Sequence, residues 1–414
     1  VNNGKVDISL IDDACKRMLL TKFKLGLFDD PFKYSNEQRE KETIYKSEHL
    51  DSARKSAAMS SVLLKNQNNS LPLNKKETIA LIGPLVKDKN NIIGNWAAAG
   101  DRNGKAISIY EGIKTHLDDS NILYSKGCNI KSDDKSGFSE AISIAKKAEK
   151  IVLVMGEDYH MSGEAASRTN IKIPKIQNEL IKTLRKEFPT KKIILILMNG
   201  RPLDLSEEDS LTDAILEVWF PGTSGGLGVA DVLFGVYNPS GKLPITFPRS
   251  IGQVPIYYNV KNTGRPISTE NPNEDYKSNY IDSPNTPLYS FGHGLSYTKF
   301  EYSDISLSSN IIGVSDILSV SVTISNLGNY DGHEIAQLYV HDKVGSLTRP
   351  VKELKGFKKI FIKKGKSKTV KFQLTVEDLK FFNGQEYTVE DGEFDIAVAG
   401  TSDISFINSF KLKL

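Results

Sequence analysis

The sequence has few of the residues that build disulfide frameworks and metal centres. Its 414 residues include only two cysteines and six histidines. Two cysteines supply neither a disulfide framework nor a zinc site. The histidines show no metal-ligand spacing, and no cluster of Cys or Asp accompanies them. We therefore expect no metal site.

The chain also lacks a strong charge bias and a long apolar run. It has 54 Lys and Arg against 51 Asp and Glu, so the net charge is only +3. This balance gives no reason to expect nucleic acid or an anionic membrane as a partner. No apolar run reaches the ~18 residues of a membrane span. The length predicts two or three domains with sizeable cores.

Residues 1–45 read differently from the rest. An amphipathic helix comes first and a polar linker follows. The helix carries an apolar stripe that needs a partner, made of Leu10, Ile11, Ala14, Cys15, Met18 and Leu19. The chain begins at Val1, without a methionine or a signal-peptide pattern. We interpret residues 1–45 as the last helix and the exit linker of a domain that a longer chain would contain.

Residues 46–255 alternate between apolar runs and helical patterns. Strands are expected at residues 78–83, 121–125, 151–155, 193–198 and 214–220. Helices are expected at residues 49–64 and near residues 108–117, 139–149, 176–188 and 226–234. Such alternation implies right-handed crossovers and a mostly parallel sheet that is covered on both faces. The prediction is a three-layer α/β/α sandwich.

The composition changes twice after this region. Proline, glycine, asparagine and tyrosine dominate residues 256–300, which predicts an irregular connecting segment. In residues 301–414 apolar side chains alternate with polar ones, as at Leu318, Val320 and Val322. About seven short strands in ~115 residues predict a fibronectin type III-like (immunoglobulin-like) β-sandwich.

Several reactive side chains follow the expected strand at residues 151–155. Ligands of open α/β sheets bind beyond the carboxyl ends of such strands. The loop carries Glu157, Asp158, His160, Glu164 and Arg168 among small residues. Glu157 and Asp158 directly follow the strand, where carboxylates often cap backbone N–H groups. Glu164 lies further out and could reach a cleft as a general acid, although a lone loop glutamate is more often simply solvated.

Two further stretches have competing interpretations. Trp96, in GNWAAAGD, could stack on a sugar ring or could be half-buried. The run GTSGGLG at residues 222–228 could cradle a phosphate, but it lacks the Lys-Ser/Thr of a Walker motif and the dinucleotide spacing. We interpret this run as close packing between a strand and a helix, and we expect no cofactor.

The motifs taken together resemble those of glycoside hydrolase family 3. KLGLFDDPF, GNWAAAGD, GEDYHMSGEAASRTNI, WFPGTSGGLGVADVLFGVYNPSGKLPITFP and PLYSFGHGLSYTKF occur in family order and are most similar to the bacterial β-glucosidase branch. The resemblance implies an N-terminal (β/α)8-type barrel, an α/β sandwich and a fibronectin III-like domain. It also implies a retaining mechanism with an Asp nucleophile from the barrel and a Glu acid/base from the sandwich.

On this resemblance, Glu164 matches the general acid/base, and Arg168 and Glu157 would organise its loop. Trp96 lies in the loop that approaches the aglycone subsite. The nucleophile motif and the sugar-holding residues of the barrel are absent from this chain. The resemblance therefore implies the C-terminal portion of a β-glucosidase-like enzyme that hydrolyses terminal β-D-glucosyl residues, with the barrel of the same enzyme as its partner. The isolated chain would be inactive.

Two alternatives stay open. The chain could be a non-catalytic, carbohydrate-related accessory module, or the sugar could be xylose, as in a β-xylosidase. A nucleotide-binding domain would rest on the glycine run alone. The family leads us to expect a periplasmic or secreted protein, although no signal peptide is visible in the chain.

Overall fold

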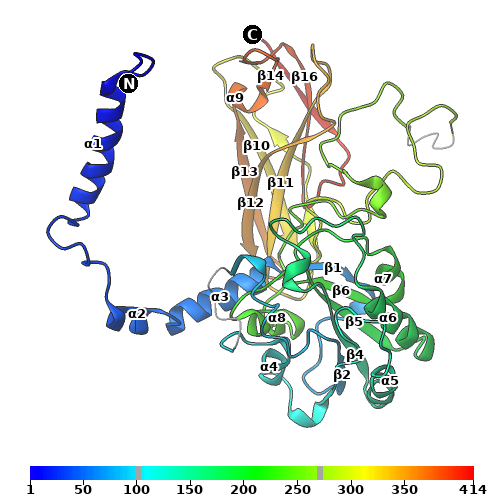
Figure 1. Cartoon of the computed structure of the whole chain (residues 1–414). Coiled ribbons are helices and arrows are strands. Elements are labelled where there is room, and N and C mark those ends of the chain that lie inside the picture. The colour runs from blue at the N-terminus through cyan, green and yellow to red at the C-terminus, as the bar shows by residue number, and fades with distance from the viewer. Residues whose placement is uncertain (98–103, 268–273) are drawn as a thin grey trace. The chain divides into compact units, whose positions relative to one another are not determined.

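The computed structural model describes residues 1–97, 104–267 and 274–414. The end of the GNWAAAGD motif and the middle of the expected connecting segment lie outside the described residues. The chain divides into two compact units, Val1–Asp51 and Ser52–Leu414 (Figure 1).

The first unit is helical. Helix α1 (Ile8–Lys24) begins after Asp7, whose carboxylate accepts a hydrogen bond from the Ser9 N–H at 2.8 Å. Helix α2 (Glu37–Thr43) lies where we expected a linker. Asn36 caps it, because the Asn36 side chain accepts a hydrogen bond from the Arg39 N–H. Neither helix contains a buried residue. The apolar stripe of α1 thus has no cover within this unit.

The second unit opens with a six-stranded sheet. Its strands are β1 (Val62–Asn66), β2 (Ile79–Ile82), β3 (Ile122–Ser125), β4 (Lys150–Gly156), β5 (Lys192–Met198) and β6 (Ala214–Glu217), in the order β1-β6-β5-β4-β2-β3. All neighbours are parallel except β1, which pairs antiparallel with β6. The expected helix at residues 49–64 was wrong at its end. Helix α3 (Ser47–Ser60) stops earlier, and the buried run that follows it is a strand.

Helices cover both faces of this sheet. They are α4 (Ile109–Lys114), α5 (Phe138–Lys147), α6 (Lys175–Glu187), α7 (Ser206–Leu211) and α8 (Gly225–Leu233). Leu153 of β4 packs in one core with residues of α5 and α6. Its neighbour Val152 packs in the other core with residues of α4 and α8. Because successive strand residues point to opposite faces, this division confirms the three-layer sandwich.

The C-terminal part is an all-β sandwich, as predicted. One sheet contains β7 (Phe300–Tyr302), β8 (Ser306–Leu307), β10 (Leu318–Asn326) and β13 (Ser367–Leu374). The other contains β9 (Ile311–Ile312), β11 (Gly332–Asp342), β12 (Glu353–Ile362), β16 (Gly392–Ala399) and β17 (Asn408–Leu412). A short helix α9 (Val376–Leu379) and the pair β14 (Phe381–Phe382) and β15 (Tyr387–Thr388) follow β13. Inward residues of both sheets share one core.

A buried side chain of β11 ties the two sandwiches together. Gln337 donates from its Nε2 to the carbonyl oxygen of Gly292 at 3.2 Å and to that of Gly400 at 2.7 Å. Leu295 forms an antiparallel bridge with Leu63 of β1. The segment between the sandwiches is thus fixed to both. Among the helices that the structure describes, none is both long and apolar enough to cross a membrane.

The glycine run at residues 222–228 permits close packing around α8. A Cβ atom on Gly226 would lie 1.9 Å from the carbonyl oxygen of Ser108. One on Gly228 would lie 2.4 Å from the carbonyl oxygen of Arg54. No side chain fits at such distances, so the packing interpretation of this run is confirmed.

Replacing Gly226 by alanine is expected to destabilise the second unit by about 1–3 kcal/mol, because a backbone carbonyl must move to admit the Cβ atom. The midpoint of urea unfolding measures the loss. Gly264→Ala is the control, because no atom lies within 4 Å of the added Cβ, and its effect should stay within about 0.5 kcal/mol. A Gly226 variant as stable as its parent would contradict the close packing.

Candidate functional site

Three polar side chains gather where β4, β5 and β6 end. These strands are parallel, and their register places Gly156 beside Met198 and Leu197 beside Glu217. Glu157 follows β4, Asn199 follows β5, and Glu217 is the last residue of β6. All three are 0% exposed. The edge of the sheet thus holds two fully buried carboxyl groups, and such groups are almost never fully buried unless they are paired.

Two arginines reach one of these carboxyls. The Nη1 of Arg168 donates to the Oε1 of Glu157, and the Nε of Arg201 lies 3.4 Å from the same oxygen. Arg168 also donates from its Nη2 to the carbonyl oxygen of Lys172 at 3.3 Å. Sequence reasoning named Glu157 and Arg168 as support for the loop, and the structure places them in direct contact. It missed Arg201, which stands in the NGRPLDL motif directly after β5.

Arg201 also holds the loop that carries Glu164. Its Nη2 donates to the carbonyl oxygen of Met161 and to that of Ala166, the latter at 2.7 Å. These two carbonyls stand on either side of Glu164. Between them the backbone turns tightly, with φ of +110° at Gly163 and +55° at Ala165. A non-glycine residue in this region costs about 1–2 kcal/mol, so the surrounding contacts must stabilise the turn.

The carboxyl group of Glu164 forms no hydrogen bond or ion pair with this cluster, whose residues the structure describes. The residue is exposed, and none of the hydrogen bonds or ion pairs found among the described residues involves it. By contrast, the carboxylate of Asp158 accepts from the His160 N–H at 2.9 Å and pairs with Lys131 at 2.7 Å. Of the acidic side chains in this loop, Glu164 is therefore the one presented freely at the surface.

Trp96 lies beside this turn. It belongs to a short 3-10 helix (Asn95–Ala97) and is 73% exposed. The Nδ2 of Asn95 donates to the carbonyl oxygen of Tyr159 at 3.1 Å, and a Cβ atom on Gly163 would lie 2.7 Å from the Asn95 side chain. The two loops therefore touch at Asn95 and Gly163. Trp96 and Glu164 are the next residues on either side of this contact.

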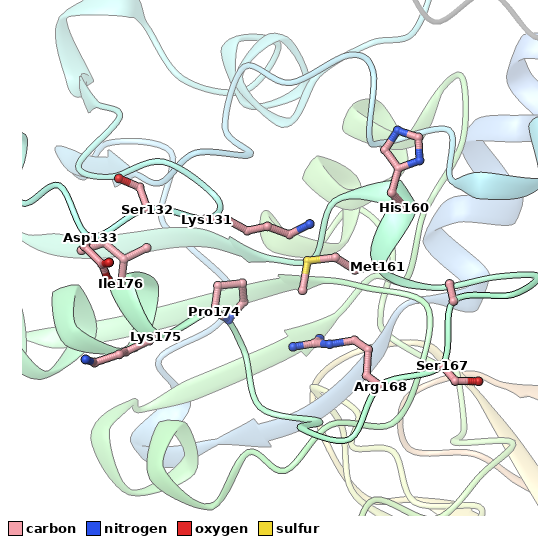
Figure 2. Close-up of a pocket in the computed structure, with 11 residues that line it drawn as sticks. Lys131, Ser132, Asp133, His160, Met161, Ser167, Arg168, Pro174, Lys175 and Ile176 are labelled. Atoms are coloured by element: carbon pink, nitrogen blue, oxygen red, sulfur yellow. The ribbon is translucent and has the colours of Figure 1, made fainter.

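A cavity of about 570 Å³ lies behind the loop, on the side of α6 (Figure 2). Arg168 and Met161 line it together with the first residues of α6. Glu164 and Trp96 are not among its lining residues. The exposed carboxyl of Glu164 therefore does not line this cavity. In the described parts of the chain, no group of three or more His, Cys, Asp or Glu side chains could hold a metal ion.

The electrostatics of the two buried carboxyls differ. Glu157 is paired with Arg168 and Arg201. Glu217 has no such cation, and burial raises its pKa well above the usual value, with repulsion from Glu157 adding to the effect. Within the described ranges, the Oε2 atoms of Glu217 and Glu157 and the Oδ1 of Asn199 are buried without a hydrogen-bond partner. Sequence reasoning missed Glu217 and Asn199, because neither residue belongs to a reactive pattern.

These features define a class of protein. A three-layer sandwich presents one free carboxylate and one exposed tryptophan on adjoining loops, and a fibronectin III-like sandwich follows it. This order of two sandwiches is the one that the resemblance to glycoside hydrolase family 3 implies for a protein of that class.

Comparison with known families and proteins agrees with this class. Residues 61–297 match the glycosyl hydrolase family 3 C-terminal domain, and residues 334–402 match a fibronectin type III-like domain. The chain belongs to glycosyl hydrolase family 3.

The similar proteins are longer than this chain. It is 43% identical to a periplasmic beta-glucosidase of Salmonella typhimurium over 437 residues, which cover 100% of this chain and 57% of that protein. It is 38% identical to a beta-xylosidase of Formosa agariphila, covering 97% of this chain and 55% of that protein. A crystal structure of the Listeria innocua beta-glucosidase with isofagomine superposes with a TM-score of 0.93 at 36% identity, covering 100% of this chain and 57% of that one. The chain thus spans little more than half the length of these relatives.

Proposed function

We propose that Glu164 is the general acid/base of a retaining β-glycosidase that removes terminal β-D-glucosyl residues. The observation that carries the proposal is its exposed carboxyl group on a turn that Arg201 holds at both sides. In the first step Glu164 protonates the leaving glycosidic oxygen. In the second step the resulting carboxylate takes a proton from the water that releases the sugar.

The nucleophile of this mechanism would belong to another domain. Retaining chemistry places two carboxyl groups ~5–5.5 Å apart. In the described part of the loop after β4, Glu157 is buried against arginines and Asp158 is bound to Lys131. Neither is free to attack a sugar. The exposed apolar stripe of α1 and the resemblance to the family support an N-terminal barrel as the partner that supplies the Asp nucleophile.

Trp96 would form part of the aglycone subsite. Its ring is largely exposed and stands next to the contact between the two loops, where the leaving group of a substrate held by Glu164 would pass. Aromatic rings of this kind stack on sugar faces. The ion pair between Arg168 and the buried Glu157 would fix the loop of Glu164 to the end of β4.

The relatives guide the choice of sugar and compartment. A glucosyl substrate is supported by the 43% identical beta-glucosidase. A xylosyl substrate is the second candidate, because the beta-xylosidase is 38% identical. The periplasmic relative supports a periplasmic or secreted location.

An activity assay tests the division of the site between domains. This chain alone should release no nitrophenol from 4-nitrophenyl β-D-glucoside, whereas the complete gene product should release it. The reason is that a two-carboxylate mechanism loses most of its rate enhancement when one carboxylate is removed. Turnover by the isolated chain would contradict the mechanism. No turnover of glucoside or xyloside by the complete product would instead favour a non-catalytic accessory module.

A further inference from the structure

One oxygen of the Glu217 carboxyl group has a hydrogen-bond donor, and the other has none among the described residues. Its Oε1 accepts from the Trp219 N–H at 2.7 Å, and its Oε2 has no partner. The side chain of Asn199, which follows the neighbouring strand β5, lies close enough to lower the pKa of this carboxyl as an amide N–H would, but no hydrogen bond joins the Oε2 of Glu217 to it. The Nδ2 of Asn199 already donates to the carbonyl oxygen of Arg201, which leaves its Oδ1 without a donor. Apart from the Oε2 of Glu157, which is also buried without a partner, two acceptor oxygens are thus unsatisfied at this edge of the sheet.

One proton would satisfy both oxygens. If the Oε2 of Glu217 carries a hydrogen, it can donate to the Oδ1 of Asn199. Turning the Asn199 amide would not help, because its oxygen would then face the carbonyl of Arg201. A buried polar group without a partner costs about 1–3 kcal/mol, so the protonated form has a clear advantage.

The ionised form of Glu217 would lack a counter-ion. The charged group that acts on Glu217 is Glu157, and Arg168 and Arg201 are the cations beside Glu157. Both arginines pair with Glu157. The structure fully describes Arg168, Arg201 and Glu217, and neither arginine forms an ion pair with Glu217 within the 4.0 Å limit between nitrogen and oxygen. An ionised Glu217 would therefore be a buried charge that also repels Glu157.

We propose that Glu217 is held in its protonated form and acts as a positioning residue for the loop of Glu164. The connection runs from Glu217 to Asn199, and from Asn199 to the backbone of Arg201. The guanidinium group of Arg201 then binds the carbonyls of Met161 and Ala166, on both sides of Glu164. That this loop serves catalysis rests on the proposed function, but the proton and the positioning do not.

Infrared spectroscopy of this chain tests the proton. At pH 7 the parent should show the carbonyl band of a protonated carboxyl group, and Glu217→Gln should lose it. Glutamine keeps both hydrogen bonds, because its amide oxygen accepts from Trp219 and its NH₂ donates to Asn199. The variant should therefore fold. If the Glu217→Gln spectrum retains this carbonyl band, the proposal is overturned.

The pH dependence of unfolding gives a second measurement of the same proton. A group with a raised pKa in the folded state adds stability that is complete below the unfolded pKa, about 4.5, and is lost as the pH rises toward the folded pKa. Glutamine does not titrate. The Glu217→Gln variant should thus gain stability over the parent as the pH rises above about 4.5. A constant difference across pH would contradict a bound proton.

Hydrogen exchange of the loop tests the positioning. Amide exchange in residues 157–170 should match the parent in Glu217→Gln and should be roughly tenfold faster in Glu217→Leu, as expected for one lost hydrogen bond. Asn199→Ala removes the next link and should act in the same direction if the leucine variant does not fold. Unchanged exchange in a folded leucine or alanine variant would overturn the positioning role.

Glu208→Leu is the matched control. Glu208 lies in α7, is also buried, and also has a raised pKa because of its burial, but its carboxyl bonds to Asn178. Its replacement should leave exchange in residues 157–170 unchanged.

In the complete gene product, Glu217→Leu should lower kcat roughly tenfold with little change in KM, and Glu217→Gln should not. If the complete product is inactive even without a substitution, the proposed function fails, but the infrared and exchange results still decide this inference.

Discussion

Replacing Glu164 by alanine in the complete gene product should lower kcat/KM for an alkyl β-glucoside about 10²–10⁴-fold. Without the carboxyl group, the departing oxygen receives no proton from the enzyme. The loss should be much smaller for a dinitrophenyl glucoside, since this leaving group departs without a proton. Steady-state kinetics on the two substrates measure the difference directly.

Two further observations separate a catalytic role of Glu164 from a general loss of structure. Added azide should restore turnover of the dinitrophenyl substrate and yield a β-glucosyl azide, because the small anion replaces the water that Glu164 would activate. Glu187→Ala is the control, because Glu187 is an exposed carboxylate at the end of α6. It should keep the activity of the parent. Equal activity in Glu164→Ala and Glu187→Ala would rule out the assignment of Glu164.

Replacing Arg168 by methionine should destabilise the α/β sandwich by about 3–5 kcal/mol. The change leaves the fully buried Glu157 with Arg201 alone, whose Nε is 3.4 Å away. Methionine retains much of the arginine volume, so the loss reports the charge and its hydrogen bonds. Urea unfolding of this chain, followed by tryptophan fluorescence, provides the measurement.

Lys131→Met is the matched control for Arg168→Met. Lys131 pairs with Asp158 at 2.7 Å in the same loop region, but its side chain is largely exposed to solvent. Exposed ion pairs contribute about 0–1 kcal/mol, and the control should lose no more than that. Similar losses in both variants would mean that the buried pair is no stronger than a surface pair.

The sequence predicted the layers well because they depend on local patterns. Continuous apolar runs identified β4 and β5, and the period of two identified β10, since both patterns follow from which faces are buried. The prediction failed where one pattern suits two structures. The buried residues Val62 and Leu63 continue the apolar pattern of α3, and pairing with β6 decides that they form a strand. No local signal contains that information.

The candidate site divides in a similar way. Glu164, Glu157 and Arg168 were named from one stretch of sequence, and their roles remain predictions. Arg201 was missed because its partners are backbone carbonyls of Met161 and Ala166, which any residue could supply. Glu217 was missed because its environment is created by the ends of three strands. Such residues are recognisable only after the sheet has brought them together.

The way in which Arg201 holds the turn has a consequence for how this enzyme family can diversify. The arginine binds main-chain oxygens, so its hold on the turn does not depend on the side chains of Met161 and Ala166. Residues such as Ala166 and Ser167 can therefore change while Glu164 stays in place. A library that varies these positions should yield altered leaving-group preference without loss of fold, which makes the turn a natural starting point for engineering.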